Sequence, residues 1–376
     1  MKRDGRADRS DNPHLLDLRD TGECGAAVPH EDGTMAASYS IRVNKETRRK
    51  NEKEKSGWRR SVTRVPIEGS DMYETVAAIL LGIMIAVGVP EYLHPKSNHV
   101  FTHRQRIAML VLLEFTGRSH EEFCRLLPTY KGFCGVMGIR TVPHPSSLSR
   151  FREITDEDEL LRMVGYFGTV CADRLAVAAD GTALSNYDRS AHYESRLKDF
   201  GAAPKRTFTK LSSAADADTL LVLACAVSEG SVHDSVHAPS LLDMLAGSGI
   251  DVEFFIADKA YDGEPLHRLV KDILNAKALI PARENTPKKG AGRYRTKGRN
   301  RSEMKRLLGK KCTIFQWNYQ LRALIECVNS IVKRKFGSSV RAKKENNRVQ
   351  SAICRIIAYN LDRILNLGLV RSIRGV

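Results

Sequence analysis

Residues 175–181 read LAVAADG and residues 252–258 read VEFFIAD, so two apolar runs each lead into an aspartate, Asp180 and Asp258. Short apolar runs between polar segments are typical of buried strands. Further strand-like or helix-like segments surround them: Arg206–Leu211 and Leu220–Val227 (strands), Pro239–Ala246 (helix) and Lys277–Pro281 (strand). Strands in series, followed by strands alternating with helices, predict a mixed α/β sheet from about residue 166 onward.

The two aspartates and a glutamate, Glu326, are candidate metal ligands. Acids at strand ends can face each other across a sheet, and a packed helix can supply a third. Magnesium takes such hard oxygen ligands. Each acid also has a purely structural interpretation: Asp180 and Asp258 as turn or cap residues, and Glu326 as the partner of Arg322, four positions earlier on a helix.

The helix predicted over Tyr319–Lys335 gives these acids a context. At 100° per residue, one face carries four polar or aromatic groups: Tyr319, Arg322, Glu326 and Lys333. The other face is apolar and is expected to be buried: Leu321, Leu324, Ile325, Val328 and Val332. A cationic face around a metal-binding carboxylate suits a phosphodiester backbone.

The spacing Tyr319-x2-Arg322-x3-Glu326-x6-Lys333 resembles the Y-R-E-K signature of a large group of bacterial and archaeal DDE transposases. Ala178–Leu184 (AADGTAL) is similar to the family's first-acid region and Ile256–Gly263 (IADKAYDG) to its second. The resemblance covers roughly residues 166 to 360.

The resemblance implies a ribonuclease H-like fold in which Asp180, Asp258 and Glu326 hold two Mg²⁺ or Mn²⁺ ions. It implies cleavage at the ends of a DNA element and strand transfer into target DNA, without a covalent protein–DNA intermediate. Tyr319, Arg322 and Lys333 would hold phosphates and bases of the element ends, although helix packing explains Tyr319 equally well. The implied partners are terminal inverted repeats, target DNA and a second copy in a homodimer.

Competing acids exist near two of the three positions. Asp262 competes with Asp258, which we prefer because it directly follows the strand. Asp173 and Asp188 compete less well with Asp180. The interval between Asp258 and Glu326 is too short for the large β insertion domain of some family members.

Residues 71–165 are predicted to form a helical DNA-binding domain in front of the catalytic domain, residues 166–376. Thr102–Leu113 has a threonine at its expected N-cap, and Ser119 with Glu122 fits a capping box. Helix, glycine-containing turn and helix match helix-turn-helix spacing, as would any packed helix pair. A helix from Ser146 is expected to carry Arg150 and Arg152 near its exposed side.

Two segments concentrate positive charge. Residues 1–70 are polar, and we expect a disordered basic arm that orders on DNA, a solubilising tail or a start assigned too early. Residues 283–311 hold twelve Lys/Arg and two Glu and predict a mobile basic loop. The whole chain of 376 residues has a net charge of +16, which favours a polyanionic partner but also fits a merely basic protein.

Other classes fit less well. The apolar run Val76–Val89 is shorter than the about 20 residues of a membrane span and predicts a buried helix. Eight scattered cysteines without C-x-x-C, and an N-terminus without a signal peptide's apolar core, favour reduced thiols in a cytoplasmic, nucleoid-associated protein. His233 and His237 could bind metal, but no further His or Cys lies near them in sequence, which disfavours zinc.

Phosphate-binding and nucleophile-elbow motifs of nucleotide, dinucleotide and acyl-transfer enzymes are absent from the sequence. Two alternatives to a transposase stay open: a ribonuclease H-like nuclease that cuts without joining, and an inactive, DNA-binding transposase relic.

Overall fold

The computed structural model describes residues 71–96, 100–171, 174–186, 196, 208–283, 298–309 and 318–369. All of them belong to one compact unit, Pro66–Val376. The predicted basic arm lies outside the described residues, and so do 284–297 and 310–311 of the predicted basic loop.

A group of helices precedes the sheet, as predicted: α3 (Met72–Ala86), α4 (His103–Thr116), α5 (His120–Leu126), α6 (Lys131–Met137), α7 (Pro145–Ile154) and α8 (Glu157–Tyr166). Helix α3 takes up most of the apolar run and buries Val76, Ile79, Leu80 and Ile83 in the core. Within the described residues, every helix is too short or too polar to cross a membrane. The apolar run is therefore a core helix, as its length predicts.

Two predicted N-caps are present at the helix ends. Thr102 Oγ1 accepts from the backbone N–H of Gln105 at 3.1 Å, and Gln105 Oε1 accepts in return from the Thr102 N–H at 2.9 Å, which completes a capping box. Ser119 Oγ accepts from the Glu122 N–H at 3.3 Å, but the Glu122 carboxylate pairs with Arg118 at 2.8 Å. The second predicted box is thus only half formed.

The expectation that Arg152 lies near the exposed side of α7 is wrong. Arg150 is exposed, but Arg152 is only 4% exposed, and its Nη2 donates to Glu114 of α4 at 3.0 Å. A buried guanidinium needs such a partner because its desolvation is costly. Arg152 therefore ties two helices together.

The sheet follows the helices, in the strand order β3-β2-β1-β4-β5 with β6 beside β1. Its strands are β1 (Leu175–Asn186), β2 (Phe208–Asp216), β3 (Val222–Glu229), β4 (Val252–Ala257), β5 (Lys277–Leu279) and β6 (Ser339–Val340). Strands β1 to β3 pair antiparallel, and β4 and β5 continue parallel to β1. This mixed sheet, flanked by helices, confirms the predicted ribonuclease H-like α/β fold.

The sequence pattern predicts that the first strand ends at Asp180. Strand β1 instead continues to Asn186. Its second half pairs with β2 as far as Ser185 and then reaches β6. The apolar run stops at Asp180 because the sheet becomes less buried there, while the backbone pairing goes on. Asp180 is therefore held inside a strand, paired with Ser213 of β2 and one residue beyond the last residue that pairs with β4.

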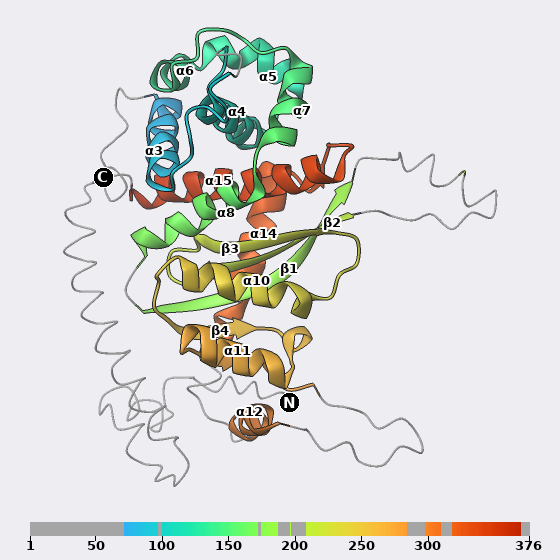
Figure 1. Ribbon diagram of the computed structural model, residues 1–376. Helices are drawn as coiled ribbons and strands as arrows, with labels where there is room; N and C mark the ends of the chain where they lie inside the picture. The colour runs from blue at the N-terminus through green and yellow to red at the C-terminus, as the bar shows by residue number, and fades with distance from the viewer. Residues whose placement is uncertain are drawn as a thin grey trace, which may run out of the picture. The chain divides into compact units, whose positions relative to one another are not determined.

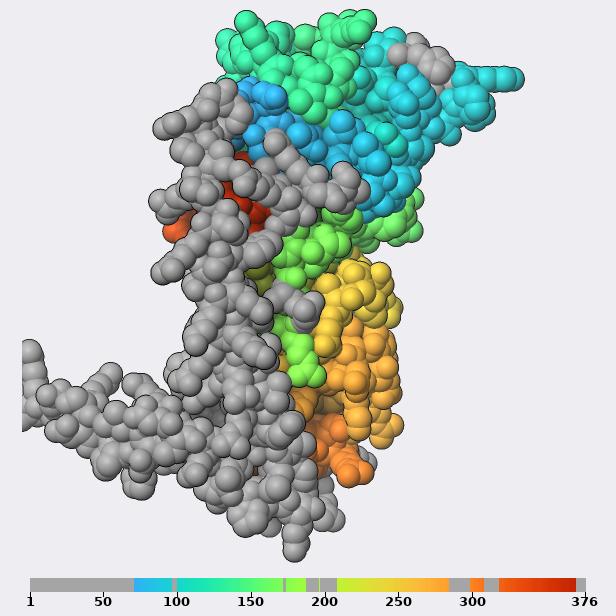
Figure 2. All heavy atoms as spheres, turned by 90° about the vertical axis from the view of Figure 1, so that its left-hand side faces the viewer, coloured from blue at the N-terminus to red at the C-terminus, as the bar shows by residue number. Residues whose placement is uncertain are grey.

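Helices cover both faces of the sheet (Figure 1). Asp180 contacts α14 (Arg322–Phe336), whereas the next residue, Gly181, lies against α10 (Asp234–Gly247). Because successive side chains of a strand point to opposite faces, α14 and α10 lie on opposite sides of β1. Figure 2 shows one side of the unit, from the blue and teal helices of residues 72–154 to the yellow and orange helices α10 and α11 (Glu264–Leu274).

The last helix, α15 (Glu345–Leu367), joins the helical region to the sheet. It packs against α4, α7 and α8 and also against β3. Its interior residues are almost all buried, including the polar Asn360, whose side chain accepts from the Val222 N–H at 2.9 Å and donates to the Val222 carbonyl at 2.7 Å. The helices and the sheet thus share one core through α15.

Two predicted boundaries change. Helix α14 begins at Arg322, so Tyr319 precedes it instead of starting it. The predicted basic loop contains a helix, α12 (Arg299–Gly309). The carboxylate of Glu264 accepts from the backbone N–H groups of Asn300 at 3.3 Å and Arg301 at 3.0 Å. Because this N-terminal cap comes from a residue distant in sequence, no local sequence pattern predicts the helix.

Candidate active site

Asp180 and Asp258 lie side by side. The parallel pairing of β1 with β4 aligns Ala179 with Ala257, so the next residue of each chain segment, Asp180 and Asp258, occupies the neighbouring position. Adjacent strands are about 4.8 Å apart, and residues in register point to the same face. Two carboxylates, 78 positions apart in the sequence, are therefore brought to one edge of the site.

Asn329 of α14 holds Asp180 by a hydrogen bond on the face of the sheet that α14 covers. Its Nδ2 donates to Asp180 Oδ2 at 3.3 Å, and its Oδ1 accepts from Ser213 Oγ at 3.3 Å. Ser213 is the cross-strand partner of Asp180 on β2. Asn329 is 6% exposed, so this bridge is largely shielded from water and sets the position of α14 over β1.

Glu326 lies one helical turn before Asn329 on α14. Its side chain is 52% exposed, and its Oε1 pairs with Nη2 of Arg322 at 2.6 Å, which matches the structural interpretation of this acid. Arg322 also lies close enough to Asp180 to interact with its charge, and Tyr319 interacts with the charges of both Asp258 and Glu326. Arg322 and Tyr319 therefore lie within electrostatic range of the acids.

Within the described residues, no group of three or more His, Cys, Asp or Glu side chains is gathered as around a metal ion. The structure brings Asp180 and Asp258 together, and it places Glu326 nearby with its carboxylate on Arg322. Lys333, two turns further along α14, is half-buried, and Tyr319 packs partly against the core.

Burial and neighbouring negative charges dominate the electrostatic surroundings of Asp180. Burial raises the pKa of Asp180, and the charges of Asp258 and Asp234 raise it further. A hydrogen bond from the Gly181 N–H and the charge of Arg322 act in the opposite direction without reversing the shift. A carboxylate in this position gains from a nearby cation.

Asp258 and its competitor Asp262 have different surroundings. Asp258 Oδ1 accepts from the Ala260 N–H at 2.6 Å and caps a short 3₁₀ turn, Lys259–Tyr261, so the predicted cap role is real. The side chain of Asp262 is fully buried. Arg301 donates two hydrogen bonds to its carboxylate, the one from Nε at 2.8 Å. Although burial opposes it, Arg301 and the Arg283 N–H hold the pKa of Asp262 below its usual value. Asp262 is therefore committed to anchoring α12.

The sequence interpretation missed a buried contact beneath Asp180. A Cβ on Gly181 would lie 2.1 Å from Oδ1 of Asp234, which forms an ion pair with Lys210 at 2.7 Å. Lys210 also donates to the carbonyl of Val232. The absence of a side chain at Gly181 therefore lets the Asp234 carboxylate lie against the strand. The dipeptide Asp180-Gly181 resembles a turn signal, but a glycine inside a strand also indicates that another group approaches the backbone closely.

His233 and His237 do not form a metal pair with each other. His233 is the N-cap of α10, and its Nδ1 lies 2.7 Å from Ser235 Oγ. His237 is buried, with Nδ1 at 2.8 Å from Ser212 Oγ, and burial and Lys210 lower its pKa. Arg283 lies 3.1 Å from His233 Nε2, so each histidine has polar protein partners of its own.

A comparison with protein families gives a match over the sheet and its helices. Residues 172–361 match the family model described as Transposase DDE domain, and this match spans just over half of the chain. The matched segment contains all six strands and the helices that carry Asp234, Glu326 and Asn329. The chain therefore belongs to the family of transposases with a DDE domain.

Proposed function

We propose that this transposase hydrolyses DNA at the ends of a mobile element and joins the freed ends to target DNA. The observation that carries the proposal is the adjacency of Asp180 and Asp258 on parallel strands, with Asn329 joining Asp180 to the helix of Glu326. In the first step water attacks a phosphodiester, breaks its P–O3′ bond and leaves a 3′-hydroxyl on the element. In the second, that hydroxyl attacks a target phosphodiester, and a target 3′-oxygen leaves.

The donor set fits divalent Mg²⁺ or Mn²⁺. All three groups are carboxylates, the ligands that hard cations prefer, and Asp180 sits in negative surroundings that a cation would relieve. Two such ions, when bound, would polarise the reacting phosphate and activate the attacking hydroxyl. Asp180 and Asp258 would hold them from the sheet, and Glu326 would join after its side chain leaves Arg322.

The remaining signature residues would handle the DNA strand. Arg322, released from Glu326, is a fork of donors suited to a phosphate. Lys333 lies seven positions after Glu326 on the same face of α14 and would contact a phosphate further along the strand. Tyr319 packs partly on the core within electrostatic range of Asp258 and Glu326, and from there it would stack on or hydrogen-bond to the DNA end.

The rest of the chain would supply DNA affinity. We propose that the helical region, residues 71–165, recognises the inverted repeats at the element ends and that residues 1–70 and 283–311 add non-specific contacts to phosphates. Two copies would act together, since two ends must be joined to one target. The catalytic part in this scheme is residues 166–376.

The test is cleavage and strand transfer by purified protein with Mg²⁺ on a duplex that carries the element end. Asp180→Asn, Asp258→Asn and Glu326→Gln should each reduce cleavage at least about 100-fold, the usual scale for losing a group that stabilises the transition state. Asp243→Asn, on the exposed side of α10, is the matched control and should cleave normally.

Three results would contradict the proposal in different ways. Full cleavage by any one of the three variants would remove that residue from the site. Cleavage without any joining of free 3′-hydroxyl ends would leave a nuclease. DNA binding without divalent-dependent cleavage by the unaltered protein would leave a DNA-binding relic.

A further inference from the structure

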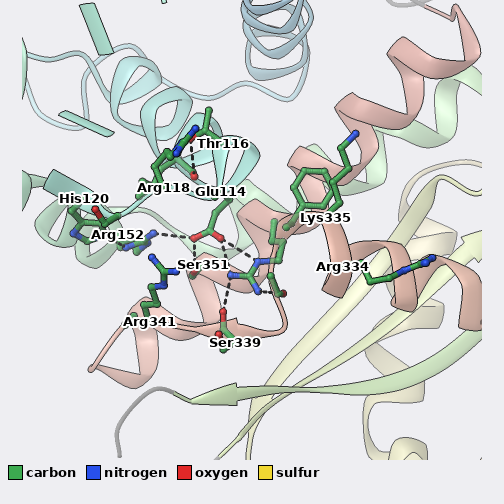
Figure 3. A pocket seen from close by; sticks show the side chains of 17 residues that line it. Glu114, Thr116, Arg118, His120, Arg152, Arg334, Lys335, Ser339, Arg341 and Ser351 are labelled. Atoms are coloured by element: carbon green, nitrogen blue, oxygen red, sulfur yellow. Dashed lines mark hydrogen bonds and ion pairs between the residues drawn. The ribbon is translucent and has the colours of Figure 1, made fainter. Parts of the chain in front are cut away.

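A basic cavity lies away from the carboxylates, where the helical region meets the end of α14. Its volume is about 450 Å³, and its lining comes from α4, the start of α5, α7, the end of α14, the segment around β6 and α15. Figure 3 shows Arg118, Arg341 and Lys335 around a central Glu114. Arg118 is far from Lys335 and Arg341 in sequence, so the fold brings these cations together.

The charge of the lining is strongly one-sided. Six permanent cations line the cavity: Arg118, Arg152, Arg334, Lys335, Arg341 and Arg355. The only carboxylate of the lining is Glu114. Together with Glu122 and Asp362, which pair with Arg118 and Lys335, three negative charges face these six positive ones, so the cavity keeps a net positive charge and attracts anions.

The floor of the cavity is held rigid by Glu114. Its carboxylate accepts from Arg152 at 3.0 Å, from Nη2 of Arg355 at 2.9 Å and from the Ser351 hydroxyl. Burial would raise the pKa of Glu114, but Arg355 and Arg152 outweigh burial and hold it below the usual value. Arg355 also donates to the carbonyls of Gly337 and Ser339, at 2.7 and 3.1 Å. The floor is therefore a fixed positive surface.

The rim of the cavity is exposed and adaptable. The side chain of Arg118 is 48% exposed and pairs with Glu122, and that of Lys335 is 51% exposed and pairs with Asp362. Arg341 is exposed at the opening. Exposed ion pairs contribute at most about 1 kcal/mol, so an incoming dianionic or polyanionic group can take over Arg118 at low cost. Asp362 is only 15% exposed, and Lys335 has further N–H donors that can bind a phosphate while it keeps this ion pair.

We propose that this cavity binds a phosphate of the DNA backbone outside the active site. The proposal rests on the proposed function, because it takes the polyanion to be the DNA that this transposase processes. Lys335 lies nine positions after Glu326 on α14, about 13 Å along the helix and on its opposite side. The phosphate held here is therefore not the one that is cut, but one that anchors the DNA across the junction of the helical region and the sheet.

The test measures DNA binding by fluorescence anisotropy at several NaCl concentrations. The variants are Arg118→Ala, Lys335→Ala, Arg341→Ala and the triple substitution. The matched control is Arg174→Ala, a 51% exposed arginine that pairs with Asp251 at the amino end of β1, the end of the strand away from Asp180. Each variant is checked by circular dichroism and urea unfolding.

We expect each single substitution to weaken binding roughly threefold to tenfold and to reduce the slope of log K against log salt concentration by about one per lost phosphate contact. The triple variant should lose more of both, and Arg174→Ala should match the unaltered protein. Two fluorescein-labelled duplexes identify the source of the phosphate. A loss confined to the duplex with the element end indicates terminal DNA, and an equal loss on an unrelated duplex indicates any DNA, target included.

An unchanged affinity and an unchanged salt slope for the folded triple variant, on both duplexes, would overturn this inference. That result differs from failure of the proposed function, in which the unaltered protein itself would neither bind these duplexes nor cleave the element end.

Discussion

Asn329 on α14 and Asp180 on β1 are joined by a hydrogen bond of 3.3 Å from Nδ2 to Oδ2. This contact links the helix that carries Glu326 to the strand that carries the first acid. The bridge is completed by Ser213, the partner of Asp180 on β2. The relative position of two candidate metal ligands thus depends on one buried amide.

Asn329→Ala should impair cleavage without removing any of the three acids. We expect a loss of about 10- to 100-fold, the usual cost of removing a residue that orients a metal ligand. The rate is measured at saturating DNA and Mg²⁺, with the neighbouring exposed Ser330→Ala as control. A cleavage rate equal to that of the control would show that Asp180 keeps its position without the amide.

Gly181→Ala tests the close approach beneath the site. The added methyl group would lie 2.1 Å from Asp234 Oδ1, so Asp234 or β1 must move, and we expect about 1–3 kcal/mol of destabilisation together with slower cleavage. Gly82→Ala is the control, because the α3 position has open space and alanine favours a helix by about 0.5–1 kcal/mol.

The double variant Gly181→Ala, Asp234→Ala separates this clash from a general effect of alanine in a strand. If the clash is the cause, alanine at 181 should cost less stability when Asp234 is already shortened, which a double-mutant cycle from urea unfolding measures. Equal costs in both backgrounds would mean that the carboxylate of Asp234 is not what Gly181 accommodates.

Asp258→Asn and Asp262→Asn should give opposite results. Asp262 is bound by Arg301 and has no exposed side-chain surface, so its loss should lower the free energy of unfolding by about 2 kcal/mol or more while cleavage stays within tenfold. Asp258→Asn should keep the stability and lose cleavage. The reverse pattern, with Asp262→Asn inactive and stable, would exchange the two residues in the proposed site.

The two strands and the acids that follow their apolar runs could be predicted from sequence because they depend on local patterns, whereas the pairing of β1 with β4 that makes Asp180 and Asp258 adjacent is long-range. Two apolar runs predict two buried strands, and each runs directly into its acid. The signature helix was predictable for the same reason, since its apolar and polar faces alternate with the helical period. Its start at Arg322 instead of Tyr319 was not, because helix ends depend on individual backbone contacts.

The contacts that were missed are long-range. Glu264 caps α12 from 36 positions away, and Glu114 meets Arg355 across 241 positions. Neither pair shows a spacing that a sequence pattern can reveal. Arg152 was expected near the exposed side because charge usually stays at the surface, and only the fold shows the carboxylate that makes its burial tolerable.

Glu114→Gln tests the network that joins the helices to α15. The substitution keeps the size of the side chain but leaves the buried guanidiniums of Arg152 and Arg355 without a counter-charge. We expect the free energy of unfolding to fall by about 3–5 kcal/mol, the typical cost of removing one partner of a buried ion pair. The measurement is urea unfolding at neutral pH, with the exposed Glu121→Gln as control. A change within about 0.5 kcal/mol of that control would show that the network contributes little.

His120 should give the stability a pH dependence in mildly acidic solution. Burial and the positive charge of Arg152 lower the pKa of His120 from 6.5 to about 4, although Glu114 acts in the opposite direction. The unfolded chain therefore binds a proton at higher pH than the folded protein does, so the folded state loses stability as the pH falls from about 6.5 to 4.

His120→Gln should remove this part of the pH dependence. Glutamine does not titrate, and its carbonyl can accept the hydrogen bond that Arg152 Nη1 shares with His120 Nε2 at 2.9 Å. Urea unfolding of the two proteins at several pH values between 4 and 7 should show the unaltered protein losing stability relative to His120→Gln as the pH falls, with the exposed His94→Gln following the unaltered protein. Parallel curves for His120→Gln and the unaltered protein over this interval would mean that His120 takes up its proton equally readily in the folded state and that Arg152 does not repel it.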